Sequence, residues 1–326
     1  MRVYRSLDEV PADFGPSAIT IGNFDGVHAG HRRILRRLKA LAGAHGWKPS
    51  VLTFDPHPTQ VVAPERAPLL MTSPERRSGL MAEEGVEQVL ILPFDGQVAL
   101  LSPEQFVRRL LVERLEARAV VVGDNFRFGY RQAGNVVVLG RLGQELGFIT
   151  EVVQAVNCRG LVVSSSAVRR MIAGGRVALA ARFLERPYAL EGAVESGRGV
   201  GSRQTVPTLN LAASAAPIPA PGVYITRTRD LDAARFWNSV TNVGYRPTFG
   251  ESDRMTVETF LLGPLAALEP ATTPRRIAVE FLERVRDERK FETSEALRSR
   301  ILQDVAVAER YFRRRAAWTT RRPAAV

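Results

Sequence analysis

Short apolar runs alternate with amphipathic patterns over the first 185 residues. The apolar runs have the length of buried strands, and they lie at Ser17–Gly22, Ser50–Phe54, Glu87–Phe94, Ala117–Gly123 and Phe148–Gln154. Between them, apolar residues at helical spacing predict helices over Arg32–Ala44 and Ser102–Leu115, the second with a capping serine and an early proline. This alternation is typical of a doubly wound, parallel α/β sheet, a Rossmann-like fold. Ligands bind such sheets at the carboxyl ends of the strands.

The pattern changes at Arg186–Pro187. Before it, a helix over Val163–Gly175 begins at serines and ends at two glycines. After it, residues of alternating polarity, separated by Gly/Pro turns, predict strands at 188–196, 222–229, 234–244, 256–262 and 275–286. Strands without intervening helices favour an antiparallel β-barrel. A helix over Ser294–Phe312, apolar along one face, closes this part of the chain.

We therefore expect three parts: a nucleotide-binding domain over 1–185, a barrel domain over 186–315, and a basic tail. The tail, 316–326, continues an arginine-rich run that begins at Arg313, and we expect it to be disordered. The chain has 326 residues, no apolar run near the ~20 residues of a membrane span, and no secretory signal at its first residues. One cysteine, Cys158, suits a reducing compartment. We predict a cytoplasmic protein without a membrane partner, as a monomer or weak homo-oligomer.

The formal net charge of +11 allows nucleic acid or small polyanions such as ATP as partners. Only three lysines contribute, at positions 39, 48 and 290, so the positive charge is nearly all arginine. Nucleic-acid binders usually combine basic residues with aromatic side chains that stack on bases. The sequence has no such motif, and we predict no nucleic-acid partner.

The stretch GNFDGVHAGH, Gly22–His31, joins the first predicted strand to the first predicted helix. Strand, glycine turn and helix form a phosphate-binding layout, because a helix amino terminus presents free N–H groups. Glycines at positions 22, 26 and 30 let the backbone approach a ligand closely. His28 and His31 can donate hydrogen bonds to phosphate oxygens. Two alternatives stay open: a zinc site with His57 of TFDPHP as a third ligand, and ordinary packing of the histidine pair.

GNFDGVHAGH resembles the H-x-G-H motif of the nucleotidyltransferase superfamily, in the form found in the FMN adenylyltransferase domain of bifunctional riboflavin kinase/FAD synthetases. Three later segments are similar to that family in the same order. They are TFDPHP at Thr53–Pro58, GDNFRFG at Gly123–Gly129 and VSSSAVR at Val163–Arg169. Ser166 stands where the family usually has threonine, and it keeps the hydroxyl.

The resemblance implies adenylyl transfer, in which the phosphate of FMN attacks the α-phosphorus of ATP and pyrophosphate leaves. Such catalysis consists of positioning and charge neutralisation. His28 and His31 are implied to stabilise charge on the phosphates, Asn125 to orient a phosphate, and Arg169 to grip the leaving pyrophosphate. Implied phosphate or nucleotide contacts come from Gly22, Asn23, Phe24, Asp25, Gly26, Gly30, Ser164, Ser165 and Ser166. Implied flavin contacts come from Phe54, Pro56, His57, Pro58, Phe126 and Phe128. Core packing is the alternative reading of Phe54 and Phe128.

The resemblance continues through Pro187–Leu211, which is similar to the riboflavin kinase module, with its glycine-rich basic loop followed by P-T-x-N. The loop GRGVGSR would wrap the ATP phosphates through Gly197, Arg198, Gly199, Gly201 and Arg203. Thr208 and Asn210 offer the oxygen ligands that Mg²⁺ prefers. No histidine follows His57, so a base in this half must be a carboxylate, and Glu258 matches the catalytic glutamate of the family. Its alternative reading is an outward-facing strand residue.

Two departures concern the kinase half. Thr205–Val206 precedes Pro207 where the family usually has glycine and phenylalanine, and LLGPLAALEP replaces an acidic turn. Our leading hypothesis is an enzyme that phosphorylates riboflavin to FMN and adenylylates FMN to FAD, using Mg-ATP and releasing FMN and FAD as products. One alternative is adenylyl transfer alone, with the barrel a flavin-binding remnant. Another is an RNA-binding or regulatory flavin sensor.

Overall fold

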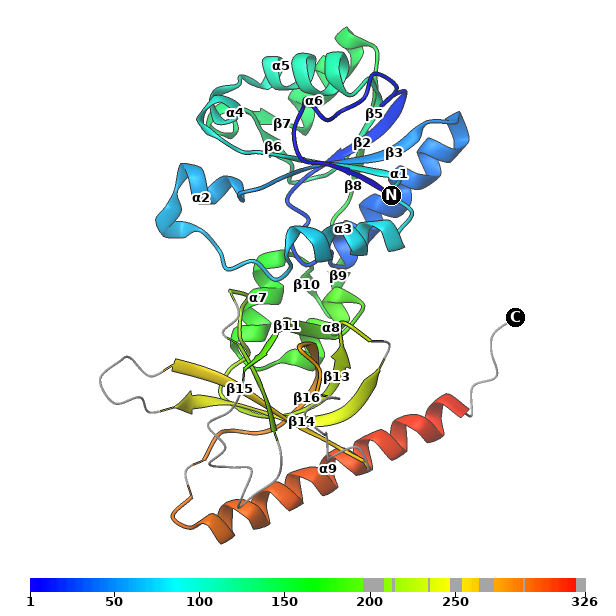
Figure 1. Ribbon diagram of the computed structural model, residues 1–326. Helices are drawn as coiled ribbons and strands as arrows, with labels where there is room; N and C mark the ends of the chain where they lie inside the picture. Colours follow the sequence, from blue (N-terminus) through cyan, green and yellow to red (C-terminus); the bar gives the residue numbers. More distant parts are fainter. Residues whose placement is uncertain are drawn as a thin grey trace. The chain divides into compact units, whose positions relative to one another are not determined.

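The computed structural model describes residues 1–195, 208–212, 215–233, 235–246, 254–263, 273–289 and 291–320, and these form two compact units (Figure 1). The units divide between Ala167 and Val168, earlier in the chain than the predicted boundary at 185/186. Most of α7 (Ser165–Ala173) and all of α8 (Val177–Leu184) therefore group with the barrel. Helix α8 packs on barrel strand β16, and it buries Val177, Ala180 and Phe183.

The first unit contains a six-stranded parallel sheet in the order β1-β4-β3-β2-β5-β8. The predicted α/β class is confirmed, and five strands lie where the apolar runs indicated. The sixth, β1, is a three-residue edge strand, too short to show any periodicity in the sequence. The strands are β1 (Arg2–Tyr4), β2 (Ser17–Ile21), β3 (Lys48–Phe54), β4 (Gln88–Leu92), β5 (Ala117–Gly123) and β8 (Ile149–Val153).

Helices cover both faces of this sheet (Figure 1). On one face lie α1 (Ala29–His45), which buries Leu35, Leu38 and Ala42, and α3 (Pro74–Glu83). On the other lie α6 (Val136–Leu146) and the segment predicted as a helix over 102–115. That segment begins as α5 (Pro103–Gln105) under a Ser102 capping box and continues as a π-helical stretch, Phe106–Arg114. The shorter elements are α2 (Pro58–Val62), α4 (Gly96–Leu100), β6 (Arg127–Phe128), β7 (Gly134–Asn135), β9 (Asn157–Cys158) and β10 (Leu161–Val162).

The second unit is a closed antiparallel barrel in the order β11-β12-β15-β14-β13-β16, as the alternating pattern predicted. A row of buried hydroxyls crosses its interior: Thr228, Ser239, Thr226, Thr241 and Thr259 are joined in that order at 2.7–2.9 Å. Each hydroxyl can donate and accept, so neighbouring hydroxyls satisfy one another along the row. The strands are β11 (Tyr188–Glu195), β12 (Thr208–Leu211), β13 (Gly222–Asp230), β14 (Phe236–Arg246), β15 (Arg254–Leu261) and β16 (Arg276–Arg286).

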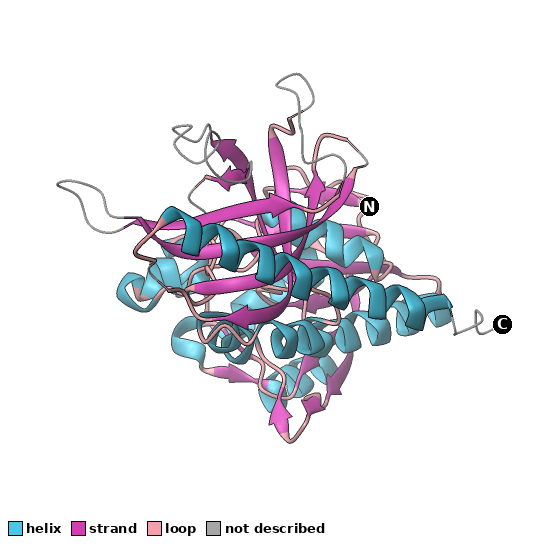
Figure 2. Ribbon diagram, turned by 90° about the horizontal axis from the view of Figure 1, so that it is seen from below, coloured by secondary structure: helices cyan, strands magenta, loops and turns pink. Residues whose placement is uncertain are grey.

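Helix α9 (Ser294–Thr320) lies across the outside of the barrel (Figure 2). Ala308 is buried beneath it, and Val305 and Phe312 pack on Val223 and Ile225 of β13 as part of the same apolar cluster. The helix continues past Phe312 to Thr320. It therefore enters the segment 316–326, which was expected to be a disordered tail, and residues 321–326 lie outside the described residues.

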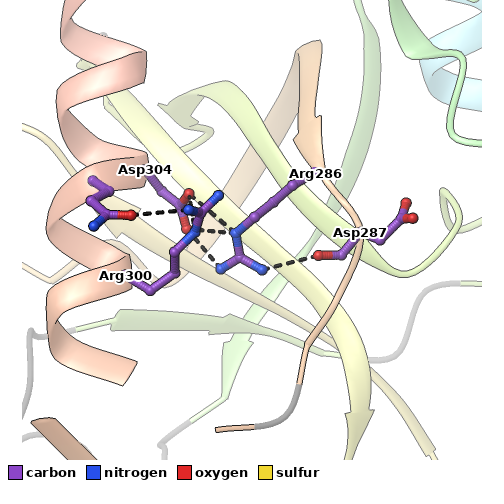
Figure 3. A network of polar contacts seen from close by, with 5 residues as sticks. Arg286, Asp287, Arg300 and Asp304 are labelled. Carbon is purple, nitrogen blue, oxygen red and sulfur yellow. Dashed lines mark hydrogen bonds and ion pairs between the residues drawn. The ribbon is translucent and has the colours of Figure 1, made fainter. Parts of the chain in front are cut away.

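A buried ion pair fastens α9 to the barrel (Figure 3). Arg286, at the end of β16, donates two hydrogen bonds from Nε and one from Nη2 to the carboxylate of Asp304, at 2.7–3.1 Å. Asp304 is 2% exposed, and Arg300, one turn earlier on α9, also approaches it at 3.4 Å. The forked guanidinium matches both carboxylate oxygens, so the pair fixes the angle of the helix as well as its position.

Candidate active sites

Three loops that carry predicted site residues leave adjacent strands at one edge of the parallel sheet. Strand β2 lies between β3 and β5, and the strand order reverses beside it. The loop after β2 holds the H-x-G-H motif, the loop after β3 holds TFDPHP, and the loop after β5 holds Asn125. Sheets of this kind bind ligands at such a switch point. The topology thus brings the separate motifs together.

The loop between β2 and α1, residues 22–28, has an unusual backbone. Phe24, Gly26 and Val27 all have positive φ angles, of 50°, 78° and 38°, and the phenylalanine and valine are buried. Such angles are costly for residues with a Cβ and persist only when the surroundings enforce them. Asp25 provides part of that enforcement, because its carboxylate accepts hydrogen bonds from the backbone N–H groups of Met71 and Thr72 at 2.9 and 3.2 Å.

His28 caps the amino terminus of α1. Its Nδ1 accepts a hydrogen bond from the backbone N–H of His31 at 3.3 Å. An imidazole nitrogen that accepts a hydrogen bond carries no proton, so in the neutral ring the proton lies on Nε2. The His28 and His31 rings stack at 3.7 Å between centroids. A Cβ on Gly30 would lie 3.1 Å from the His28 ring, so glycine at this position permits the stack.

His31 is held neutral by its surroundings. Burial, then the nearby His28 and Arg77, lower the pKa of His31 well below its usual value of 6.5. Its Nδ1 is buried and has no hydrogen-bond partner among the described residues. His31 therefore offers a hydrogen-bonding ring rather than a positive charge at neutral pH.

His57 ties the TFDPHP loop to the H-x-G-H loop. Its Nε2 lies 2.9 Å from the side-chain amide of Asn23, and its Nδ1 accepts from the backbone N–H of Thr59 at 3.2 Å, capping α2. Both ring nitrogens of His57 therefore make hydrogen bonds that hold these loops. Within the part of the chain that the structure describes, no group of three His, Cys, Asp or Glu side chains is placed to hold a metal ion.

The predicted flavin residues differ in exposure. Phe54 and Phe128 are 8% and 6% exposed and belong to one core cluster, where packing accounts for most of their surface. Phe126 is half-buried and stacks on Phe128 at 5.3 Å between centroids. Pro56 is exposed, Pro58 is half-buried, and Asn125 is exposed beside the end of β5. Of the three phenylalanines predicted to contact flavin, Phe126 is thus more exposed than Phe54 and Phe128.

The serine-rich segment 163–169 is hydrogen-bonded to the H-x-G-H loop. Ser165 donates from Oγ to the backbone carbonyl of Asp25 at 2.9 Å. Ser164 Oγ accepts from the backbone N–H of Ala167 at 3.2 Å, as a helix cap does, and Ser166 is exposed. Arg169 lies one turn further along α7 and is half-buried.

Sequence reasoning missed Arg77 of α3. This arginine is 1% exposed, and its guanidinium donates to the backbone carbonyls of Asn23 and Phe54, in two of the site loops. The sequence SPERRSGLMAE carried a signal for the helix, since a capping serine precedes proline and an acidic residue. It carried none for the burial, because two adjacent arginines usually indicate a solvated face.

A second constellation lies on the barrel. Asn210 of β12 pairs in register with Glu258 of β15, which pairs in register with Asn242 of β14. Leu209, Val257 and Thr259, at alternate positions, are buried in the interior, so this polar row lies on the outer face. All three residues of the row are half-buried. Glu258 thus lies on the outer face of the barrel, between two asparagines.

Two further residues adjoin this row. Thr208, two residues before Asn210 on β12, shares the outer face and is exposed. A Cβ on Gly244, next but one to Asn242 on β14, would overlap the carboxylate of Glu288. Asn242 was not singled out from the sequence. The loop residues Gly197, Arg198, Gly199, Gly201 and Arg203 lie outside the described residues, as do Thr205 and Val206.

Comparison with known proteins covers both units. The family model of FAD synthetase matches residues 10–167, and that of riboflavin kinase matches residues 184–312. A bifunctional riboflavin kinase/FMN adenylyltransferase of Pseudomonas fluorescens is 36% identical over 308 residues, covering 94% of this chain and 97% of its own. The protein of that name from Escherichia coli K12 is 32% identical, covering 96% and 97%.

A solved structure from Streptococcus pneumoniae, described as a macrolide-efflux protein, superposes with a TM-score of 0.82. It covers 94% of this chain and 98% of its own at 24% identity, so the likeness bears on the fold. Among the described residues, every helix is too short or too polar to cross a membrane.

Proposed function

The chain belongs to the family of bifunctional riboflavin kinase/FMN adenylyltransferases and catalyses both reactions, and we propose which of its residues carry each one. The loops at the switch point of the parallel sheet adenylylate FMN, and the outer face of the barrel phosphorylates riboflavin. The observation that carries the first assignment is the convergence of the H-x-G-H, TFDPHP and Asn125 loops at three adjacent strand ends.

In adenylyl transfer, an oxygen of the FMN phosphate forms a bond to the α-phosphorus of ATP, and the bond to pyrophosphate breaks. His28 donates from Nε2 to a phosphate oxygen, because its Nδ1 is occupied by the N–H of His31. The amino terminus of α1 adds free N–H groups beside it. His31 contributes a neutral ring next to the same phosphates. These groups stabilise the charge that moves from the α-phosphate to the leaving group.

Other predicted residues hold the substrates. Asn125 orients a phosphate from its exposed position after β5, and Arg169 binds the leaving pyrophosphate through its forked guanidinium. The start of α7 is supported by Ser164, Ser165 and Ser166, and Ser165 donates a hydrogen bond to the H-x-G-H loop. The flavin ring binds over Phe126, the most exposed of the predicted phenylalanines, with Pro56 and Pro58 beside it. Phe54 and Phe128 form the floor beneath.

In the kinase reaction, the terminal ribityl hydroxyl of riboflavin attacks the γ-phosphorus of ATP, and ADP leaves. Glu258 removes the hydroxyl proton as general base. The register that aligns it between Asn210 and Asn242 supports this role, since amide groups on both sides can orient a carboxylate. The loop 197–203 wraps the ATP phosphates.

Mg²⁺ fits the oxygen donors on this face. Thr208 and Asn210 share the outer side of β12 and carry neutral oxygens, which suits a cation that takes its remaining ligands from phosphates and water. We propose that these two residues hold it with ATP. When bound, the ion neutralises phosphate charge.

The partners are riboflavin, FMN, FAD and ATP. We propose a cytoplasmic protein, monomeric or weakly self-associating, that binds neither nucleic acid nor membranes. In this proposal, the net charge of +11 attracts polyanionic substrates such as ATP.

The first experiment is incubation of the protein with riboflavin and Mg-ATP, with the flavins separated over time. FMN should appear and then give way to FAD. The residue assignments are tested by Glu258→Gln, which should abolish FMN formation but leave FMN adenylylation intact. His28→Asn should do the reverse, since asparagine keeps the helix cap and removes the imidazole. Each variant's unaffected reaction controls for folding, and loss of the wrong activity would refute the assignment.

A further inference from the structure

Arg77 is among the most buried large side chains in the protein. It belongs to α3, on the face of the sheet covered by α1, and it is 1% exposed. A guanidinium is almost never buried without specific partners, because removing it from water is costly. The contacts that compensate Arg77 therefore indicate why the chain keeps it.

Those contacts lie at the two loops of the adenylyltransferase site. Nη1 donates to the backbone carbonyl of Asn23 at 2.7 Å, in the H-x-G-H loop. Nη2 reaches the backbone carbonyl of Phe54 at 3.5 Å, where β3 enters TFDPHP. The same two loops are joined a second time through the Asn23 and His57 side chains. One side chain from a third element thus spans the carboxyl ends of two neighbouring strands.

The guanidinium of Arg77 also interacts electrostatically with charged side chains around the site. Three carboxylates act on it: Asp25 in the H-x-G-H loop, Asp55 after β3, and Glu75 on α3 itself. The positive charge of Arg77 also acts on His31, and it lowers the pKa of that histidine together with burial and His28. The Nε atom of Arg77 and the Nδ1 atom of His31 are both buried without hydrogen-bond partners among the described residues. A fixed positive charge therefore lies beneath the loop that receives the phosphates.

We propose that Arg77 is a positioning residue for adenylyl transfer, which fastens the H-x-G-H loop to the TFDPHP loop and provides a permanent cation beneath the phosphate site. The proposal rests on the assignment of FMN adenylylation to these loops. Arg77 touches backbone carbonyls rather than reacting atoms in this structure, so its effect passes through loop geometry and local charge. The two contributions can be separated, because lysine keeps the charge without the fork and glutamine loses the charge.

The test compares Arg77→Lys and Arg77→Gln with a control, Arg76→Gln, on the adjacent residue of the same helix. For each protein, kcat and KM for FMN and for ATP are measured from pH 5 to 9, together with riboflavin phosphorylation. Arg77→Lys should raise both KM values about tenfold with an unchanged pH profile, because the guanidinium no longer joins the loops and only the contact between Asn23 and His57 remains. Arg77→Gln should lower kcat/KM about 100-fold, the order of loss expected from misplaced reacting groups.

Arg77→Gln should also move the acid limb of the profile to higher pH. Without the guanidinium, protonation of His31 is opposed by burial and His28 but no longer by Arg77, so the pKa of His31 rises. Riboflavin phosphorylation should stay at the wild-type rate in all three variants. Failure of wild-type protein to adenylylate FMN would refute the functional assignment instead.

Equal losses in the lysine and glutamine variants, with no change in the pH profile, would identify a purely structural role and overturn the proposal. Wild-type KM values in both variants would overturn it as well. If Arg77→Gln does not fold, Arg77→Lys decides: raised KM values with intact kinase activity support the proposal, and unchanged values refute it.

Discussion

From the Arg286–Asp304 pair we predict that removing the charge of Asp304 by a single substitution will destabilise the barrel unit. Asp304→Asn keeps the shape of the side chain but leaves the charge of Arg286, whose side chain is 13% exposed, without its carboxylate. Breaking one partner of a buried pair costs about 3–5 kcal/mol. We take about 3 kcal/mol, because the amide oxygen of asparagine still accepts one hydrogen bond and Arg286 keeps its bond to the carbonyl of Asp287. For a unit of this size, that corresponds to a decrease in Tm of about 6–12 °C.

The two activities of the chain allow this loss to be assigned to one unit. Aliquots are heated to increasing temperatures and then assayed for riboflavin phosphorylation and for FMN adenylylation. The temperature of half-inactivation should fall for the kinase and stay constant for the adenylyltransferase. The matched control is Glu309→Gln, which removes an exposed pair with Arg313 on the same helix and should cost under about 0.5 kcal/mol. A kinase shift no larger than that of the control would refute the reasoning.

Further predictions concern the first unit. Since the pKa of His31 is lowered well below 6.5 in the folded chain, the unfolded chain gains a proton below that pH while the native chain does not. The free energy of unfolding should therefore decrease by up to about 1.4 kcal/mol per pH unit below 6.5, and urea titrations of His31→Gln should lack this component. Gly30→Ala should lower FMN adenylylation about tenfold, because the new Cβ displaces the His28 ring. Gly43→Ala, on the same helix in open space, should leave the rate unchanged and stabilise α1 by about 0.5–1 kcal/mol. Equal rates of FMN adenylylation in the Gly30→Ala and Gly43→Ala variants would contradict the expectation for Gly30.

The fold could be predicted from sequence wherever burial imposes a pattern. Strands β2 to β5 are enclosed on both faces and form continuous apolar runs in the sequence. Strands β11, β12 and β15 alternate in polarity because only one of their faces is enclosed. Strand β1 and helix α2 are too short to show a period. Helix α3 was missed because its buried positions include Arg77 and Ser78, so polar residues occupy part of its apolar stripe. The π-helical hydrogen bonding of residues 106–114 leaves no mark in the pattern of side chains.

The candidate sites show a similar division. Motifs located His28, Asn125 and Glu258, because their neighbours in sequence identify them. Arg77 and Asn242 reach the candidate sites only through the fold, the first from a helix packed beneath two loops and the second through strand register. Neither relation exists until the sheet and the barrel have formed. The exposure of Phe126, and the burial of Phe54 and Phe128, likewise depend on which side of each loop faces the core.

The row of hydroxyls inside the barrel constrains how this protein can evolve. Because each hydroxyl satisfies its neighbour, replacing Thr241 by valine leaves Thr259 buried without its partner in the row, at a cost of about 1–3 kcal/mol. Replacing the whole row by apolar residues of similar shape removes every such group at once and can be nearly neutral. The single steps of such an exchange are disfavoured although its endpoint is not. We expect positions 226, 228, 239, 241 and 259 to vary as a group among related chains, so that a lineage keeps the polar row or loses all of it.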